Sequence, residues 1–215
     1  MILVFDLDNT LINRNKAYYA WLKNLLYKQE IDEDTWQAIY NKDNWGYCSR
    51  LEFYSWIIKE FKLNEEVNFY INKCAAELHQ FIEKDTLVLE MLKRLSLKFE
   101  IVIATNGSVQ NQTNKLKASG ILDFVKPKNI FISETLKLKK PAKEFFQIIE
   151  NQFLKKSEFV MIGDDPINDI EGAKRLNWKT VWLSFDRKIE LDSDFIIKDI
   201  FALEKKVIAH FFPFF

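Results

Sequence analysis

The chain opens with MILVFDLDNT, residues 1–10, and this stretch indicates both a fold and a site. Its first five residues are apolar, and a short continuous apolar run is typical of a strand buried on both faces of a parallel sheet. Asp6 and Asp8 follow at once. If the extended backbone continues through them, the two carboxylates lie on one face, because residues two apart point to the same side. Ligands of α/β sheets bind beyond the carboxyl ends of the strands, so we expect a site around these two residues.

Further apolar runs predict more strands, and helical patterns lie between them. The expected strands are Ile2–Phe5, Ile101–Ala104, Ile130–Ile132, Phe159–Ile162 and Thr180–Leu183. The expected helices are Thr86–Leu97, Val109–Ala118, Lys143–Leu154 and Ile167–Leu176. Strands that alternate with helices are typical of an α/β fold, and here they predict a doubly wound, Rossmann-like parallel sheet.

Residues 14–83 break this alternation, because no convincing strand pattern occurs among them. They show the period of amphipathic helices and are rich in Trp and Tyr. The expected helices are Ala17–Gln29, Asp34–Asn41, Leu51–Phe61 and Glu65–Phe81. We interpret residues 14–83 as an all-α domain inserted into an α/β core made of residues 1–13 and 84–215.

The composition narrows the class of protein. The 215 residues include 31 basic and 31 acidic side chains, so the formal net charge is zero and no global field favours nucleic acid or an anionic membrane. No apolar run reaches the roughly 18 residues of a membrane span, and no signal-peptide pattern precedes Asp6. Two cysteines suit a reduced protein. We expect a cytoplasmic monomer or homodimer. The apolar tail Val207–Phe215 is expected to be a last core helix, with an interface or a membrane-touching end as alternatives.

Two polar segments after later strands suit an anion. Residues 105–108, Thr-Asn-Gly-Ser, open a helix, and their hydroxyl, their amide and the free helix N–H groups suit a phosphate group. An ordinary capped turn would use the same residues. Lys140, directly before Pro141, could neutralise a phosphate group or a crowded set of carboxylates. A solvated lysine at a helix entry is the alternative.

Acidic residues gather after the fourth predicted strand. Asp165 could cap the helix that follows, but Asp164 has no such local role, and we expect it to bind a metal ion or to pair with a lysine. Asp6 and Asp8 pose a related problem, because neighbouring carboxylates repel each other. A divalent cation relieves that repulsion, and oxygen ligands suit Mg²⁺.

These four segments together resemble the motifs of the haloacid dehalogenase superfamily of phosphotransferases. Residues 6–10 match its first motif, D-x-D-x-T, and Thr105 matches the hydroxyl residue of its second. Lys140 matches the lysine of its third motif. Residues 163–169 match the fourth, G-D-x-x-x-x-D, with Asp164 and Asp169. The helical insert also lies where many members carry a cap.

The resemblance implies a magnesium-dependent phosphohydrolase. Asp6 would be the nucleophile and would form an aspartyl-phosphate. Asp8 would protonate the leaving oxygen and then activate water, and its presence favours phosphorus over carbon chemistry. Mg²⁺ would be held by the Asp6 carboxylate, the Asp8 backbone carbonyl and Asp164.

The same resemblance assigns the remaining polar residues. Thr105, the Asn106 N–H and Lys140 would bind the phosphoryl group. Asp169, and with it Asp165, would orient Lys140 or the waters of the metal ion.

The substrate would be a small phosphorylated metabolite such as a nucleoside monophosphate or a sugar phosphate, chosen by the helical cap. In the cap, Trp45 and Tyr47 could stack on a base or a sugar, and Arg50 could grip an anionic group. Packing between helices is the alternative for all three. Two other functions stay open, namely a phosphomutase on the same scaffold and a non-enzymatic, phosphorylatable binding module.

Overall fold

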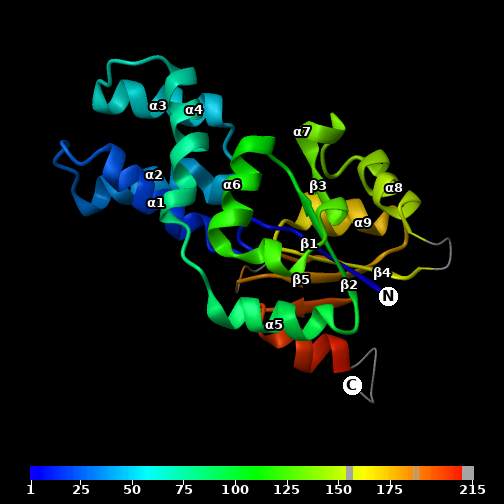
Figure 1. Ribbon diagram of the computed structural model, residues 1–215. Coiled ribbons are helices and arrows are strands. Elements are labelled where there is room, and N and C mark those ends of the chain that lie inside the picture. The colour runs from blue at the N-terminus through cyan, green and yellow to red at the C-terminus, as the bar shows by residue number, and fades with distance from the viewer. Residues whose placement is uncertain (154–156, 186, 188, 210–215) are drawn as a thin grey trace. The chain divides into compact units, whose positions relative to one another are not determined.

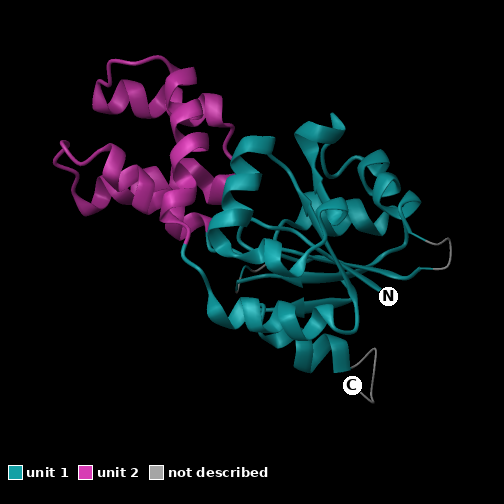
Figure 2. Ribbon diagram, in the orientation of Figure 1, with its two compact units in different colours: residues 1–13, 83–215 teal, residues 14–82 magenta. Residues whose placement is uncertain are grey.

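A computed structural model describes residues 1–153, 157–185, 187 and 189–209. These residues form two compact units, one made of 1–13 with 83–215 and the other of 14–82 (Figure 2). The boundary between the inserted segment and the second part of the core therefore lies one residue before the predicted one. Each unit has its own hydrophobic core.

The first unit is built on a parallel sheet of six strands in the order β3-β2-β1-β4-β5-β6 (Figure 1). The strands are β1 (Ile2–Phe5), β2 (Glu100–Thr105), β3 (Ile130–Ile132), β4 (Phe159–Gly163), β5 (Lys179–Leu183) and β6 (Phe195–Ile197). This order is that of a doubly wound sheet, so the predicted fold class is confirmed. The sequence did not predict β6, which forms one edge of the sheet.

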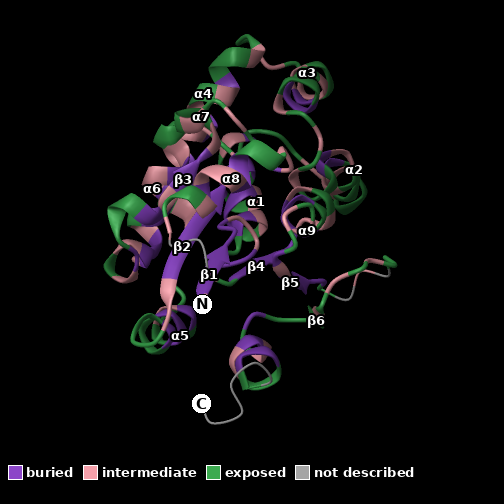
Figure 3. Ribbon diagram, turned by 90° about the vertical axis from the view of Figure 1, so that its right-hand side faces the viewer, coloured by how far each residue is buried: buried purple, intermediate pink, exposed green. Residues whose placement is uncertain are grey.

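Strand β1 lies in the middle of the sheet and pairs with β2 on one side and β4 on the other. Its four residues are all buried, as expected of a strand that is covered on both faces (Figure 3). The chain first builds outward through β2 to β3 and then returns to the other side of β1. The strand order reverses at β1, and in such sheets the crevice at that point binds ligands.

The two faces of the sheet are covered by different helices. Residues that alternate along β1, namely Ile2 and Val4, pack into a cluster with Phe145 and Phe146 of α8 (Lys143–Asn151) and with Ala173 of α9 (Gly172–Lys174). Helix α5 (Thr86–Ser96) and the C-terminal helical segment (Leu203–Ile208) lie on the opposite face in Figure 1. Alternation along a strand sends successive side chains into these two layers.

The helices of the first unit agree in position with most of the predicted ones. They are α5 (Thr86–Ser96), α6 (Val109–Ser119), α7 (Ser133–Leu136), α8 (Lys143–Asn151) and α9 (Gly172–Lys174), with short 3-10 turns at Ile121–Phe124 and Pro127–Asn129. The single helix expected over Ile167–Leu176 is instead a π-helical segment, Pro166–Glu171, followed by the short α9. Helix α7 was not predicted.

The second unit contains only helical elements. They are α1 (Arg14–Leu25), α2 (Glu33–Asp43), α3 (Arg50–Phe61) and α4 (Val67–Glu77), with 3-10 turns at Asn44–Gly46 and Leu78–Phe81. Its core is aromatic, and Tyr18, Trp21, Phe53 and Tyr54 are fully buried in it. The Trp and Tyr residues that mark this segment in the sequence thus supply much of its core.

A π-helical segment, Leu203–Ile208, ends the described chain, and Leu203, Val207 and Ile208 in it are buried. The rest of the predicted tail, residues 210–215, lies outside the described residues. No helix in the described part of the chain has both the length and the apolar character needed to span a membrane.

Candidate active site

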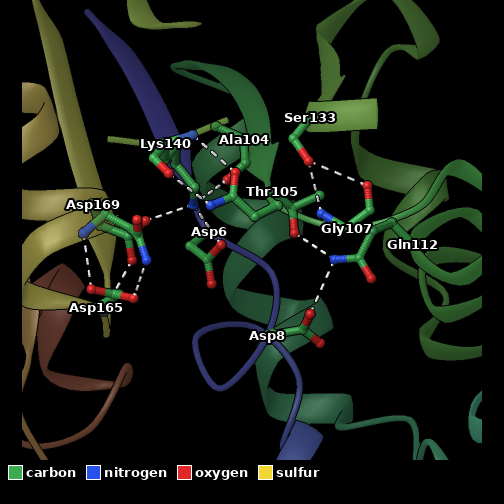
Figure 4. Close-up of polar contacts among 12 residues, drawn as sticks. Asp6, Asp8, Ala104, Thr105, Gly107, Gln112, Ser133, Lys140, Asp165 and Asp169 are labelled. Atoms are coloured by element: carbon green, nitrogen blue, oxygen red, sulfur yellow. Dashed lines mark hydrogen bonds and ion pairs between the residues drawn. The ribbon is translucent and has the colours of Figure 1, made fainter. Parts of the chain in front are cut away.

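Asp6 lies directly beyond β1 and continues its pairing, because its N–H donates to the carbonyl of Ile162 at 2.9 Å. Its side chain is almost fully buried and contacts Lys140, whose Nζ donates to Asp6 Oδ1 at 2.7 Å. Lys140 Nζ also donates to Asp169 Oδ1 at 2.6 Å and to the carbonyl of Ala104 at 2.7 Å (Figure 4). All three N–H bonds of the ammonium are thus used within the protein.

The backbone of Lys140 is fixed by Asn106. The Asn106 side chain accepts from the N–H of Lys140 at 2.9 Å and donates to its carbonyl at 3.0 Å. The sequence assigned only the backbone N–H of Asn106 to a role, as a phosphate donor. Its side chain has a second role that sequence reasoning missed, since it ties the end of β2 to the segment that carries Lys140.

Burial and charge act in opposite directions on these groups. Burial works to lower the pKa of Lys140, but the charges of Asp169 and Asp6 outweigh it, so the pKa lies above its ordinary value and the ammonium stays charged. Burial raises the pKa of Asp6, the charge of Lys140 opposes this rise, and the charge of Asp8 adds to it. Burial also raises the pKa of Asp169 to about 7, against the charge of Lys140.

Three buried carboxylates meet beside this lysine. Oxygens of Asp6, Asp164 and Asp169 all lie within 4.8 Å of one another. Asp169 uses both of its oxygens, since Oδ1 accepts from Lys140 and Oδ2 accepts from the N–H of Asp165 at 3.0 Å. Burial raises the pKa of Asp164 well above its ordinary value, and the charges of Asp6 and Asp169 raise it further. The carboxylate oxygens of Asp6 and Asp164 are therefore ligands that would suit a divalent cation.

The backbone of Asp164 is held by side chains that the sequence did not indicate. Trp182 Nε1 donates to the carbonyl of Asp164 at 3.0 Å, and Arg187 donates to the same carbonyl. Arg187 Nη2 also lies 3.7 Å from Asp164 Oδ2. Asp165 acts as the predicted helix cap, because its Oδ1 accepts from the N–H groups of Ile167 and Asn168, both at 2.9 Å.

Asp8 is held by the helix that follows β2. Lys115 Nζ lies 2.7 Å and 2.8 Å from the two carboxylate oxygens of Asp8, and Gln112 Nε2 donates to Oδ2 at 3.0 Å. The same Nε2 donates to Thr105 Oγ1 at 2.5 Å, so Gln112 bridges two predicted site residues (Figure 4). Sequence reasoning missed both Gln112 and Lys115.

At the start of α6, where the sequence suggested either a phosphate cradle or an ordinary capped turn, several backbone N–H groups have protein partners. Ser133 Oγ accepts from the N–H of Gly107 at 2.9 Å, and the Glu134 carboxylate accepts from the N–H of Val109 at 2.8 Å. The N–H of Asn111 donates to Ser108 at 3.3 Å. These amide groups have protein partners, so they are not the free helix N–H groups that the sequence suggested. Thr105, which is buried at the end of β2, remains as a candidate hydroxyl donor.

Comparison with known proteins identifies the family. A family model described as haloacid dehalogenase-like hydrolase matches residues 3–183. The chain belongs to this family. A pyrimidine 5'-nucleotidase from Streptococcus pneumoniae is 27% identical over 203 residues, which cover 84% of this chain and 82% of that protein. A glyceraldehyde 3-phosphate phosphatase from Pyrococcus furiosus is 27% identical over 219 residues, which cover 90% of this chain and 85% of that protein.

A solved structure agrees with the fold. The magnesium-bound crystal structure of YfnB from Bacillus subtilis has a TM-score of 0.78 and 24% identity, and the match covers 95% of this chain and 96% of that chain. The family match and the curated relatives together make this chain a phosphatase of the haloacid dehalogenase-like hydrolases. The family resemblance and the enzyme class that the sequence predicted are confirmed.

The three residues of the helical unit that the sequence singled out lie on and beside one turn. Trp45 and Tyr47 are 44% and 45% exposed. Arg50 instead lies against the fully buried Asp43, with Nη2 donating to Asp43 Oδ1 at 2.7 Å, and Arg14 contacts the other oxygen at 3.3 Å. The structure thus shows the two aromatic side chains partly exposed and Arg50 engaged inside its own unit.

Proposed function

We propose that this phosphatase hydrolyses a small phosphomonoester with Mg²⁺, through an aspartyl-phosphate on Asp6. The observation that carries the proposal is the buried contact of Asp6 with Lys140, in a cluster with Asp164 and beside Asp8. A carboxylate held next to a fixed cation can act as a nucleophile towards phosphorus without leaving its charge unbalanced.

The reaction would take place in two steps. In the first, an oxygen of Asp6 attacks phosphorus and the bond from phosphorus to the ester oxygen breaks. The proton of Asp8 goes to that oxygen, and the alcohol leaves. In the second, a water molecule gives a proton to the Asp8 carboxylate and its oxygen attacks phosphorus. The bond to Asp6 then breaks, inorganic phosphate leaves, and both carboxyl groups are restored to their starting states.

The phosphoryl group would be bound by a hydrogen bond from the hydroxyl of Thr105 and attracted by the charge of Lys140. Lys140 is charged and fixed, and Thr105 lies at the end of β2. Mg²⁺, held by Asp6, Asp164 and the backbone carbonyl of Asp8, would withdraw charge from the phosphoryl oxygens. The Asp8 carboxylate is engaged by Lys115, which supports a backbone rather than a side-chain contact to the ion. Asp169 would keep Lys140 in place.

The substrate class is a small phosphorylated metabolite. The pyrimidine 5'-nucleotidase and the glyceraldehyde 3-phosphate phosphatase are both named for small phosphomonoesters, and both cover most of this chain. We propose that the helical unit is a cap that selects the substrate. Trp45 and Tyr47 would contact a base or a sugar, and Arg50 would support their turn through Asp43 rather than grip an anion itself.

Phosphate release from a panel of nucleoside monophosphates and sugar phosphates tests the proposal. Wild type should release phosphate in Mg²⁺ and not in EDTA. Asp6→Asn, which keeps the size of the side chain, should lose at least about 10³-fold in kcat, in line with removal of a nucleophile. Equal rates in the two proteins would refute the assignment of Asp6. Isomerised sugar phosphate without phosphate release would indicate a phosphomutase, and phosphorylation without turnover would indicate a binding module.

A further inference from the structure

Helix α6 places polar residues on the face where a helix normally places apolar ones. Its buried residues are Gln112, Lys115, Leu116 and Ser119, at the spacing of one helix face. Gln112 is 0% exposed and Lys115 is 3% exposed. A buried lysine is costly unless it is paired, and an apolar side chain would pack there without that cost. The two residues are also the ones that contact Asp8, which indicates a role beyond packing.

The contacts restrict Asp8 to one orientation. Lys115 holds both carboxylate oxygens, and Gln112 adds a third hydrogen bond to Oδ2. The Asp8 side chain keeps 27% of its surface exposed, so the carboxylate is held by these contacts and is still accessible. A general acid must lie within hydrogen-bond reach of the oxygen that it protonates, and an error of about 1 Å can cost roughly 10²-fold in rate.

Gln112 also determines how Thr105 can act. Its amide nitrogen faces the Asp8 carboxylate, which only accepts hydrogen bonds when it is ionised, so the amide orientation shown is the one with a donor towards Asp8 in that state. The same nitrogen donates to Thr105 Oγ1, and the hydroxyl of Thr105 is therefore an acceptor in that contact. The proton of this hydroxyl is left to point elsewhere, and it can donate to a phosphoryl oxygen.

The sequence provides room for this bridge at Gly107. A Cβ at residue 107 would lie 2.9 Å from Cδ of Gln112, and the φ of Gly107 is +146°. Any larger residue would push the Gln112 side chain out of its place beneath the turn. The turn and the helix are thus fitted to each other so that Gln112 reaches Thr105 and Asp8.

We propose that Lys115 and Gln112 are positioning residues. They hold the acid/base carboxylate of Asp8 in a fixed position relative to the phosphate-binding hydroxyl of Thr105. This inference rests on the proposed function of Asp8. Neither residue touches the reacting atoms. The amide of Gln112 and the ammonium of Lys115 keep two groups at a fixed separation. These are the proton donor, Asp8, and the hydroxyl of Thr105 that donates a hydrogen bond to the phosphoryl group.

Dependence on the leaving group separates this role from a merely structural one. The nitrophenolate of p-nitrophenyl phosphate leaves without a proton, whereas the alkoxide of an alkyl phosphomonoester needs one. The value of kcat/KM includes the steps up to the departure of the leaving group. Only the kcat/KM of the alkyl ester is therefore sensitive to the proton transfer from Asp8. Lys115→Met should therefore lower kcat/KM on the best alkyl substrate of the panel by about 10- to 100-fold, and on p-nitrophenyl phosphate by less than about threefold.

Both substrates are measured on one preparation of each variant, so an unfolded fraction lowers both rates equally and cancels in their ratio. Lys117→Met is the matched control, because Lys117 lies on the same helix and is exposed, and it should leave the ratio unchanged. Lys115→Arg keeps the cation and should recover part of the loss. Gln112→Glu keeps the size but replaces the donor, and it should change the ratio in the same direction as Lys115→Met.

Equal losses on the two substrates in Lys115→Met and in Gln112→Glu would overturn the inference and assign both residues to stability alone. A ratio change as large in Lys117→Met would also overturn it, because helix charge rather than contact would then be responsible. The proposed function is tested separately, since it predicts that Asp6→Asn loses activity on both substrates. If Lys115→Met yields no folded protein, the ratio in Gln112→Glu decides.

Discussion

Lys140 shows how much of the candidate site depends on one side chain. It is buried, and its ammonium contacts Asp6 after β1, the carbonyl of Ala104 in β2 and Asp169 after β4. A buried ammonium with two carboxylate partners is stable only while those partners stay in place, because an unpaired charge in the interior is costly. The residues that hold Asp169 are therefore as important to Lys140 as its direct contacts.

Gly163 leaves the space that the Asp169 side chain occupies, and Gly163→Ala should displace Asp169. A Cβ at residue 163 would lie 2.2 Å from Asp169 Oδ2. We expect a loss of about 1–3 kcal/mol in the free energy of unfolding, as for other overpacked sites. We also expect a loss of kcat, since Asp169 would no longer orient Lys140. Denaturant unfolding and phosphate release measure the two effects.

Gly120→Ala is the control for this variant. Gly120 has a φ of +79°, and an added Cβ would meet its nearest atom at 3.4 Å, so this change should cost stability without altering kcat. If Gly163→Ala lost stability but kept the wild-type kcat, Asp169 would not be the residue that orients Lys140 for catalysis.

The raised pKa values of the carboxyl groups predict how pH acts on stability. Burial raises the pKa of Asp169 to about 7, above the ordinary value of 3.8 that the unfolded chain has, and it raises the pKa of Asp164 in the same direction. The folded protein then binds protons that the unfolded chain releases. The contribution of Asp169 to stability is complete below about pH 4 and is lost as the pH rises through about 7, and the contribution of Asp164 has the same sign.

A bound cation should reverse this loss, because it stabilises the carboxylates that deprotonation leaves. We expect the increase in Tm caused by Mg²⁺ to be larger at about pH 8 than at about pH 5.5. Thermal unfolding in EDTA and in Mg²⁺ at the two pH values measures it, and other titrating groups cancel in the difference. Asp164→Asn should remove most of the Mg²⁺ effect. An increase in Tm that is the same at both pH values would contradict the prediction.

At the scale of the elements, strand β1 and helix α6 differ in how far their sequences reveal them. Continuous apolar runs predicted β1 to β5, because strands buried on both faces have no polar positions to obscure the pattern. Strand β6 is only three residues long, Phe195–Ile197, and one of its side chains is exposed, so its run was too short to recognise. The π-helical segment after β4 was not predicted, because its sequence is also compatible with an ordinary α-helix.

The candidate site was predictable where its residues follow strands. Asp6, Thr105 and Asp164 are located by the strand ends, since the topology brings those ends together. Gln112 and Lys115 lie inside a helix, and whether a polar residue of a helix faces the solvent depends on what packs against it. The available signal was the weakly apolar inner face of α6, on which only Leu116 of the four buried residues is apolar.

The turn between α2 and α3 carries a prediction about substrate choice. Asn44 and Trp45 are non-glycine residues with φ of 46° and 58°, a left-handed conformation that costs energy and is often found at functional sites. If this turn contacts a base, Trp45→Ala and Tyr47→Ala should each raise KM for nucleoside monophosphates by about 5- to 50-fold, as expected for loss of about 1–2 kcal/mol of aromatic stacking. The KM for p-nitrophenyl phosphate should change less.

Tyr27→Ala is the matched control, because Tyr27 is an aromatic residue of the same unit that is 72% exposed and lies outside this turn. It should leave both KM values unchanged. A KM for nucleotides that is unaffected in all three variants would show that the turn does not contact the base.

At the scale of the whole molecule, the insertion of residues 14–82 after β1 raises the question of whether they fold alone. The side-chain partners that the structure describes for the buried carboxylate of Asp43 lie within this segment, namely Arg14, Arg50 and Tyr19. Its aromatic core is also assembled from its own four helices. A unit whose buried charges and apolar side chains are satisfied internally has what a domain needs to fold independently, although about 70 residues give only a modest core.

We therefore expect residues 14–82, expressed alone, to unfold cooperatively and to show a near-ultraviolet circular dichroism signal from the packed Tyr18 and Trp21. Asp43→Asn in this fragment should lower its stability by about 3–5 kcal/mol, because it leaves the buried guanidinium of Arg14 and the partly exposed one of Arg50 without a counter-charge. Lys42→Gln, at the neighbouring and more exposed position, should cost less than about 1 kcal/mol. A helical fragment without a near-ultraviolet signal would mean that the aromatic core of residues 14–82 forms only in the complete chain, and that the two units fold as one.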